Sequence, residues 1–286
     1  MKKILGTGLA LALLAGTAAA ADLPVYKARK ADPLWDVAIG GWVASDYNFR
    51  GVSQSNRHAS GGAYFELQLN NIAGGQLYVG TAVSAIDIQT GSEVDFQAGW
   101  RKTWGKLGID VGYIYYWYPA EKAVASLGLG GLDTDFMEVY VKASYAVTSD
   151  LTFGLSVFYS PDVLHAGGQL LNAQGLYTEA SAKYVLPLST PTAYGPLGAF
   201  VSGAVGHWDI NNGVAVYGTD VSYTYWNAGV AFTLSALTLD LRYHDTDLTP
   251  AECAAFMFGG APTTRWCSGT FIAKLSFDTL LSKIKN

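Results

Sequence analysis

The feature that most constrains the fold is a two-residue alternation of apolar and polar side chains that recurs along most of the chain. One clear example has apolar residues at Val139, Val141, Ala143 and Tyr145, separated by Tyr140, Lys142 and Ser144. Successive side chains of a β-strand point to opposite faces, so such a segment has one apolar face and one polar face. Helical periodicity is almost absent. The sequence therefore predicts an all-β protein whose strands face two different solvents.

Composition decides which solvents these are. Hydrophobic residues make up 50% of the chain and charged residues only 14%. A soluble protein needs a more charged surface than this, and no segment after the first 21 residues has the run of about 18 apolar residues that a membrane-spanning helix requires. A closed antiparallel transmembrane β-barrel satisfies both observations, because its strands present apolar side chains to lipid and polar side chains to the lumen.

The alternation predicts about twelve strands, an even number as expected for a single-chain bacterial barrel. We expect them near residues 35–48, 61–71, 75–87, 93–103, 106–118, 135–147, 150–159, 175–186, 198–208, 221–234, 236–246 and 268–278.

The connections between these strands alternate in length. Short turns are expected at 71–74, 104–105, 148–149 and 234–235, and long connections at 49–60, 119–134, 160–174, 209–220 and 247–267. Short periplasmic turns and long outer loops are typical of outer-membrane barrels. Two connections fit less well: 88–92 is short for an outer loop, and 187–197 is long for a turn.

The N-terminus resembles an export signal. Lys2 and Lys3 precede an apolar run and the small residues Ala18–Ala21, which predicts a signal peptide over 1–21 cleaved on export; a retained anchor helix is the alternative. A lead-in over 22–34, a barrel over 35–278 and a tail over 279–286 would follow. Loss of Lys2 and Lys3 takes the net charge from -5 to -7, which does not favour nucleic-acid binding.

The two cysteines lie in the last long connection. In an exported chain, Cys253 and Cys267 favour a disulfide that stiffens an outer loop. A metal site is the alternative, but His244 is the nearest histidine and stands alone. We therefore expect no metal and no cofactor.

Aromatic residues gather near the expected strand ends, where interfacial girdles of a barrel would lie. Core aromatics of a soluble β fold are the alternative. The residues concerned are Trp35, Trp42, Tyr47, Trp100, Trp104, the run Tyr113 to Tyr118, Trp208, Tyr223, Tyr225, Trp226 and Trp266.

Two short segments resemble known proteins. Ala21-Asp22-Leu23-Pro24 is similar to the mature start of many alphaproteobacterial outer-membrane proteins, and Ala44 to Ser55 (ASDYNFRGVSQS) resembles the signature of the TorF-type porin family of proteobacteria. The resemblance covers about a dozen residues and extends weakly to the rest of the chain. It implies an outer-membrane barrel, implies a pore loosely, and carries no catalytic residues. The family's usual aromatic C-terminus corresponds to Phe277, but nine further residues follow.

The ionisable residues on the polar phase of the strands are the candidates for lining a pore. They are Glu66, Glu93, Asp95, Arg101, Asp110, Glu138, Lys142, Glu179, Lys183, Asp240, Arg242 and Lys274. Neither sign of charge dominates, and a barrel of this size leaves a narrow lumen. The predicted function is passive diffusion of small hydrophilic solutes across the outer membrane of a Gram-negative bacterium, in contact with outer-membrane lipids. A lumen plugged by salt bridges among the same residues is the alternative.

Two other function classes stay open. An outer-membrane enzyme of the protease or lipase type could use His207 with Asp209, or His244 with Asp245 and Asp247, although neither group has an obvious nucleophile. A structural or adhesive surface protein could act through the long loops. The sequence leaves the choice between a monomer and a homo-oligomer open.

Overall fold

The computed structural model describes residues 33–87, 91–119, 133–165, 172–257 and 265–284. The predicted signal peptide and most of the lead-in lie outside these residues.

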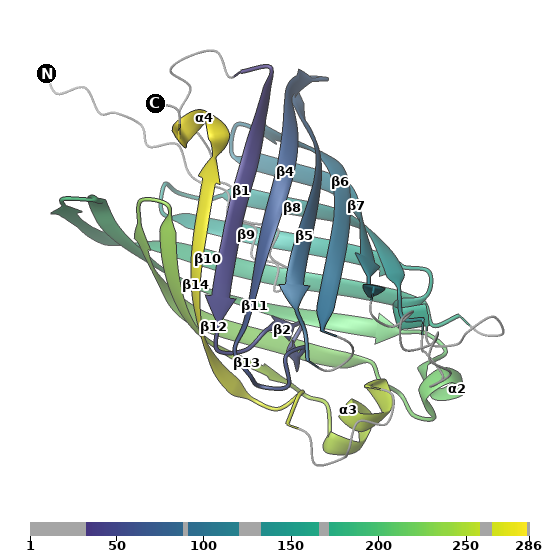
Figure 1. Cartoon of the computed structure of the whole chain (residues 1–286). Helices are drawn as coiled ribbons and strands as arrows, with labels where there is room; N and C mark the ends of the chain where they lie inside the picture. The colour runs from purple at the N-terminus through teal and green to yellow at the C-terminus, as the bar shows by residue number, and fades with distance from the viewer. Residues whose placement is uncertain (1–32, 88–90, 120–132, 166–171, 258–264, 285–286) are drawn as a thin grey trace, which may run out of the picture.

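Twelve strands close into one antiparallel barrel (Figure 1), and each corresponds to one strand expected from the alternation. Around the barrel the order is β1-β14-β13-β12-β11-β10-β9-β8-β7-β6-β5-β4, so β1 closes the sheet by pairing with both β14 and β4. The strands are β1 (Trp35–Ala44), β4 (Ser60–Ile72), β5 (Gly75–Ala85), β6 (Ser92–Trp104), β7 (Leu107–Trp117), β8 (Phe136–Ala146), β9 (Leu151–Ser160), β10 (Gly175–Thr192), β11 (Gly195–Ile210), β12 (Tyr223–Leu234), β13 (Leu237–Thr246) and β14 (Thr270–Leu280). The predicted closed antiparallel barrel is confirmed.

The two ends of the barrel differ. At one end, the short-turn end, the strands are joined by tight turns, and the chain leaves β14 through the short helix α4 (Leu281–Ile284). At the other, the long-loop end, lie α2 (Gly213–Tyr217), α3 (Pro250–Phe256) and the 3-10 turn η1 (Val163–His165). Figure 1 shows α4 at the opposite end of the barrel from α2 and α3. The predicted alternation of connection lengths is therefore present in the fold.

Several strand boundaries differ from expectation, and β1 ends at Ala44 rather than near residue 48. The segment 187–197 is not a long turn, because β10 and β11 continue as a paired ribbon to Thr192 and Gly195. Pro187 and Pro191 in this ribbon mask its strand character in the sequence. In addition, β14 runs to Leu280, two residues into the predicted tail.

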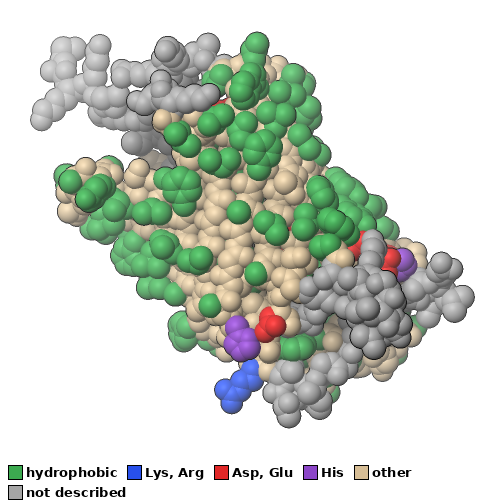
Figure 2. Space-filling view, viewed as in Figure 1, with side chains coloured by type: hydrophobic (Ala, Val, Ile, Leu, Met, Phe, Trp, Pro, Cys, Tyr) green, Lys and Arg blue, Asp and Glu red, His purple; other side chains and the backbone are tan. Residues whose placement is uncertain are grey.

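The outer face of the barrel wall is apolar. In β8, Val139 and Val141 are 45% and 50% exposed, whereas the intervening Tyr140 and Lys142 are 6% and 8% exposed. The same alternation exposes Phe65, Val79, Phe96, Val111, Phe153, Leu155, Val205, Leu239 and Leu275. Figure 2 shows hydrophobic side chains spread over the wall, with most of the charged ones in this view near the long-loop end. Such a face is suited to contact with hydrocarbon rather than water.

One segment leaves the wall and folds into the barrel. Between β1 and β4, the two-residue strands β2 (Asn48–Phe49) and β3 (Val52–Ser53) pair only with each other. Phe49, Val52 and Ser53 are buried. We call residues 46–57 the inner hairpin. Residues 46–48 were predicted to end the first strand and 49–57 to be part of a long outer loop, and their inward position is a correction to that prediction.

No helix within the described residues has the length and apolar character needed to cross a membrane.

Candidate functional site

The twelve ionisable residues predicted to line a pore all lie on the inward phase of their strands. Glu66, Glu93, Asp95, Asp110, Glu138, Lys142, Glu179 and Arg242 are buried, and Arg101, Lys183, Asp240 and Lys274 are half-buried. None belongs to the exposed apolar phase. The inner wall of the barrel therefore carries ionisable side chains from most of its strands.

Near the short-turn end, these side chains pair across neighbouring strands. Arg101 donates to Glu66 at 2.6 Å and to Gln76 at 2.6 Å. Tyr78 donates to Asp110 at 2.6 Å, and its ring lies 4.6 Å from the Arg101 guanidinium. This cluster links β4, β5, β6 and β7 through their inward-facing side chains.

A second cluster lies on β11, β12 and β13. Arg242 donates to Asp240 at 2.8 Å, to Ser202 at 2.7 Å and to Asn227 at 2.5 Å. Each of these partners faces inward from a strand of the wall, so the guanidinium is held against the wall rather than across the lumen. Each cluster contains one salt bridge between residues predicted to line the pore, Arg101–Glu66 at 2.6 Å and Arg242–Asp240 at 2.8 Å.

The inner hairpin turns at Arg50 and Gly51, and both have positive φ, 48° and 89°. A two-residue turn of this kind matches the twist of a tight hairpin. Gly51 also has no room for a side chain, since a Cβ atom there would lie 2.2 Å from Thr246 Cγ2. The chain therefore presents Arg50 at the tip of the hairpin, inside the barrel.

Arg50 is fully buried and forms a two-hydrogen-bond ion pair with Glu138, at 2.8 and 2.9 Å. Its guanidinium carbon lies 4.0 Å from the ring centroid of Tyr177, 4.3 Å from Trp208 and 5.0 Å from Phe158. Burial is the largest single influence and would lower the pKa of Arg50, but the charge and hydrogen bonds of Glu138, with smaller contributions from Tyr116 and Tyr177, together raise the pKa above its ordinary value. The guanidinium thus stays charged.

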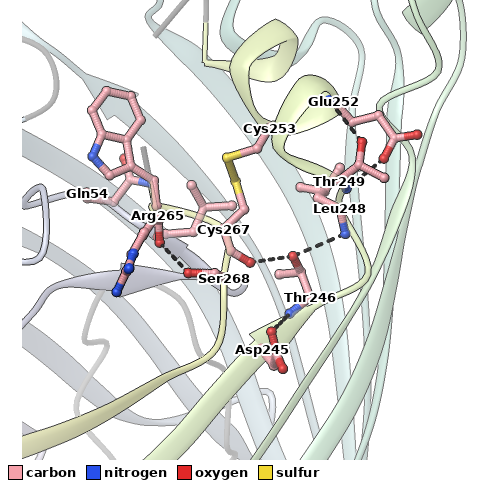
Figure 3. The surroundings of a disulfide bond; sticks show 12 residues. Gln54, Asp245, Thr246, Leu248, Thr249, Glu252, Cys253, Arg265, Cys267 and Ser268 are labelled. Atoms are coloured by element: carbon pink, nitrogen blue, oxygen red, sulfur yellow. Dashed lines mark hydrogen bonds between the residues drawn. A yellow bond between two sulfur atoms is a disulfide. The ribbon is translucent and has the colours of Figure 1, made fainter. Parts of the chain in front are cut away.

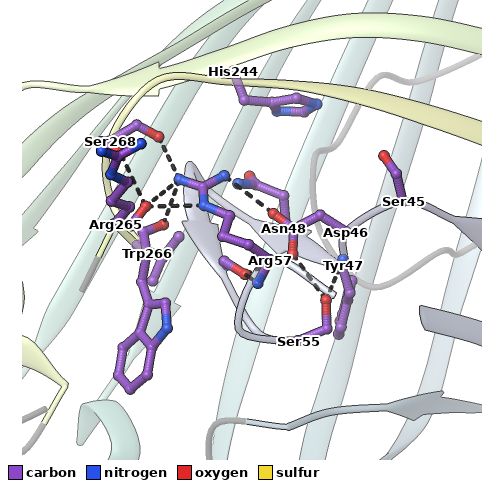
Figure 4. A network of polar contacts seen from close by, with 12 residues as sticks. Ser45, Asp46, Tyr47, Asn48, Ser55, Arg57, His244, Arg265, Trp266 and Ser268 are labelled. Carbon is purple, nitrogen blue, oxygen red and sulfur yellow. Dashed lines mark hydrogen bonds and ion pairs between the residues drawn. The ribbon is translucent and has the colours of Figure 1, made fainter. Parts of the chain in front are cut away.

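Further contacts hold the rest of the inner hairpin. Tyr47 donates to Glu93 at 2.6 Å, and burial together with this carboxylate raises the pKa of Tyr47. Arg57 pairs with Asp46 at 3.1 Å and donates to the backbone carbonyl groups of 265, 266 and 268 (Figure 4). Ser53 N–H also donates to the Trp266 carbonyl at 2.8 Å. The hairpin is therefore fixed to the last long loop.

That loop contains the predicted disulfide, which the structure confirms between Cys253 and Cys267 (Figure 3). Cys253 lies in α3, whose start is capped by Thr249 and Glu252. The carbonyl of Cys267 accepts a hydrogen bond from Thr246 at the end of β13. The disulfide joins the loop that holds the inner hairpin to a helix at the mouth of the barrel.

The aromatic residues divide between two locations, which corrects the prediction that all of them form girdles. Trp35, Trp104, Tyr113 and Trp226 are exposed on the outer face. By contrast, Trp42, Tyr47, Tyr116, Tyr118, Trp208, Tyr223 and Tyr225 are buried inside the barrel, where most pack around the inner hairpin. Strand phase explains the division, because on β7 the even-numbered residues share the inward phase of Asp110.

The histidines of the two candidate catalytic groups lie on different faces of the barrel wall. His207 and Asp209 lie on the exposed phase of β11, and His207 Nδ1 is 3.2 Å from Thr224 Oγ1. His244 faces inward and lies 2.9 Å from the Tyr225 hydroxyl, whereas Asp245 occupies the opposite phase of β13. Within the residues that the structure describes, no three His, Cys, Asp or Glu side chains are grouped as metal ligands.

The inner hairpin is the part of the site that the sequence did not reveal. Residues 44–55 were predicted as the end of a strand and the start of a long outer loop and were noted as a family signature, and Arg50 was not among the pore-lining candidates. Its partner Glu138 was predicted to face inward, and is 88 positions away in the sequence.

Comparisons with known proteins agree with the barrel fold. Residues 28–267 match the family described as "Bacterial protein of unknown function (Gcw_chp)". Curated protein sequences give no match. Among solved structures, the NanC porin aligns with a TM-score of 0.50 and 12% identity, covering 85% of this chain and 98% of that chain. The KdgM porin aligns with a TM-score of 0.48 and 7% identity over 84% and 98%. At these identities the likeness concerns the fold alone.

Proposed function

We propose, starting from the fact that the chain belongs to the Gcw_chp family of bacterial proteins, that it is an outer-membrane channel for passive diffusion of small hydrophilic solutes. The TorF-type porin assignment suggested by residues 44–55 is part of this proposal. So are export by the predicted signal peptide, and contact with outer-membrane lipids. No catalytic activity is proposed.

The two-faced wall carries the proposal. An exposed apolar face such as that of β8 is costly in water, and charged side chains such as Glu66 and Arg101 are costly in lipid. A membrane on the outside and water on the inside satisfy both. Inside the barrel, polar groups occur at every level described, from the Arg101 cluster to Glu93 and Glu138.

The asymmetry of the barrel supports an orientation. Outer-membrane barrels have short periplasmic turns and long extracellular loops. We therefore place the short-turn end, with α4, in the periplasm, and the long-loop end, with α2 and α3, outside the cell. The disulfide then lies on the extracellular side, where oxidised cysteines persist.

The inner hairpin limits the size of the solute. Twelve strands already give a lumen between the filled barrels of eight strands and the wide channels of sixteen. The hairpin and the aromatic side chains around it occupy the half of this lumen nearer the long loops. We expect a low conductance, with passage limited at the level of Arg50.

Planar-bilayer recording tests the proposal. Purified wild-type protein should give discrete conductance steps, and a variant with 48–53 replaced by a Gly-Ser linker should give steps several-fold larger. A matched control replaces 213–217, in α2, by a linker of equal length, and should behave as wild type. Absence of steps from wild type and both variants, each shown by heat-modifiable gel migration to be a folded barrel, would refute the proposal.

A further inference from the structure

We infer that the buried surroundings of Arg50 are a recognition site for solutes that carry a guanidinium or alkylammonium group, and that Arg50 occupies this site while the inner hairpin is docked. The inference rests on the proposed channel function and names the class of solute. We call the wall residues of this site the cation cage: Glu138, Phe158, Tyr177, Glu179 and Trp208.

The chemistry of the cage suits an organic cation. Glu138 supplies two carboxylate oxygens in a geometry that holds both terminal nitrogens of a guanidinium. Tyr177 and Trp208 place their rings 4.0 and 4.3 Å from its carbon, which is within the range of a cation–π interaction. All of these side chains belong to the barrel wall, on β8, β10 and β11, and so remain in place if the hairpin leaves.

The cage is not fully used by Arg50. Glu179 Oε1 has no hydrogen-bond partner, although the residue is 2% exposed and its other oxygen accepts from Tyr177 at 2.7 Å. Trp208 Nε1 and Arg50 Nε also have no partner. A buried carboxylate oxygen without a donor is costly. A second carboxylate, with capacity to accept, is therefore available to a ligand with more donors or a different shape.

Carboxyl groups gather at this level of the barrel. Besides the two carboxylates of the cage, Glu93 and Asp95 are buried on β6, and Asp95 Oδ1 also has no partner. Lys142 and Arg242 are basic side chains of the wall that interact with Glu179, and the Lys142 ammonium lies 5.3 Å from the Phe158 ring centroid. Without Arg50, the carboxylates named here outnumber the basic groups.

The barrel wall closes without the hairpin. The backbones of β2 and β3 pair only with each other, and the hairpin is held to the wall by the side-chain contacts of Arg50 with Glu138 and of Tyr47 with Glu93. A tethered group competes with free ligand at an effective concentration in the millimolar range. A solute that binds the cage must displace Arg50, so its apparent affinity for wild type is lower than for a protein lacking that side chain.

Isothermal titration of the detergent-solubilised full-length protein with methylguanidinium tests this. Arg50→Ala should bind at least tenfold more tightly than wild type, Arg50→Lys should stay close to wild type because it still fills the cage, and Arg50→Ala combined with Glu138→Gln should lose the gain. Tetramethylammonium should show the same order of affinities among the variants as methylguanidinium. Acetate should show no binding to any variant.

Failure to gain affinity in a folded Arg50→Ala barrel would overturn the inference. If that variant does not fold, Arg50→Gln, which keeps most of the side-chain volume, takes its place with the same expected direction. Binding together with the absence of conductance would refute the channel but support the cage. Conductance without a gain in binding would refute the cage alone.

Discussion

The buried ion pair between Arg50 and Glu138 gives the sharpest test of how the inner hairpin is held. Arg50 and Glu138 are 0% and 1% exposed, and two hydrogen bonds of 2.8 and 2.9 Å join them. Removing one partner of such a pair leaves a buried charge without compensation, at a cost of about 3–5 kcal/mol. Glu138→Gln keeps the shape of the side chain and one acceptor oxygen. We therefore expect it to lower the free energy of unfolding by about 3 kcal/mol, near the lower end of that range.

A double-mutant cycle with Arg50→Ala, Glu138→Gln and the double variant isolates the pair. Urea unfolding in phospholipid vesicles, followed by tryptophan fluorescence, measures the free energy of unfolding of each variant. We expect the double variant to be less destabilised than the sum of the single ones by about 2 kcal/mol. Asp87→Asn is the control, because the His58–Asp87 pair is exposed and its loss should matter little. Additivity of the two single changes within about 0.5 kcal/mol would refute the proposed role of the pair.

Three further predictions concern the wall and the mouth of the barrel. Val141→Arg, on the outer face, should lower the free energy of unfolding in vesicles by about 2–4 kcal/mol, and a neutral effect would argue against contact with lipid. Replacing Cys253 and Cys267 by Ser should lower the free energy of unfolding by about 3 kcal/mol, as expected for the observed sequence separation of 14. The change should also speed proteolysis of the last long loop, and an unchanged cleavage rate would contradict this. Gly206→Ala would place a Cβ atom 2.3 Å from the Tyr177 hydroxyl. It should therefore displace Tyr177 from the cage and lower the free energy of unfolding by about 1–3 kcal/mol in the same assay. An unchanged unfolding midpoint would show that Tyr177 moves aside at no cost.

The strands could be predicted because alternation repeats independently in each of them. The outward position of residues such as Val139 and Val141 follows from the alternation within their own strand, with no need to know which strands pair with it. The same alternation places Glu138 and Lys142 inside the barrel. The barrel ribbon at 185–197 was missed because Pro187 and Pro191 resemble turn residues, yet they lie on the edge of β10 beyond its pairing with β9.

The inner hairpin could not be predicted in the same way. Its strands have two residues each, too short for a periodic signal, and Arg50 is an ordinary loop residue until its distant partner Glu138 is known. The buried aromatic cluster was in part predictable. Tyr116 shares strand phase with Asp110, so the alternation that placed Asp110 inside also places Tyr116 there. Treating Tyr113 to Tyr118 as one interfacial group overlooked this.

The central claim is that one side of each strand contacts hydrocarbon and the other faces the interior of the barrel. Spin labels on single cysteines placed in turn at 139 to 143 of the reconstituted protein test it directly, since both native cysteines are in the disulfide. We predict that labels at Val139, Val141 and Ala143 collide frequently with oxygen dissolved in lipid and rarely with a water-soluble nickel chelate, and that labels at Tyr140 and Lys142 show low oxygen contact. Loss of this two-residue periodicity, or high nickel contact at Val139 and Val141, would contradict the account.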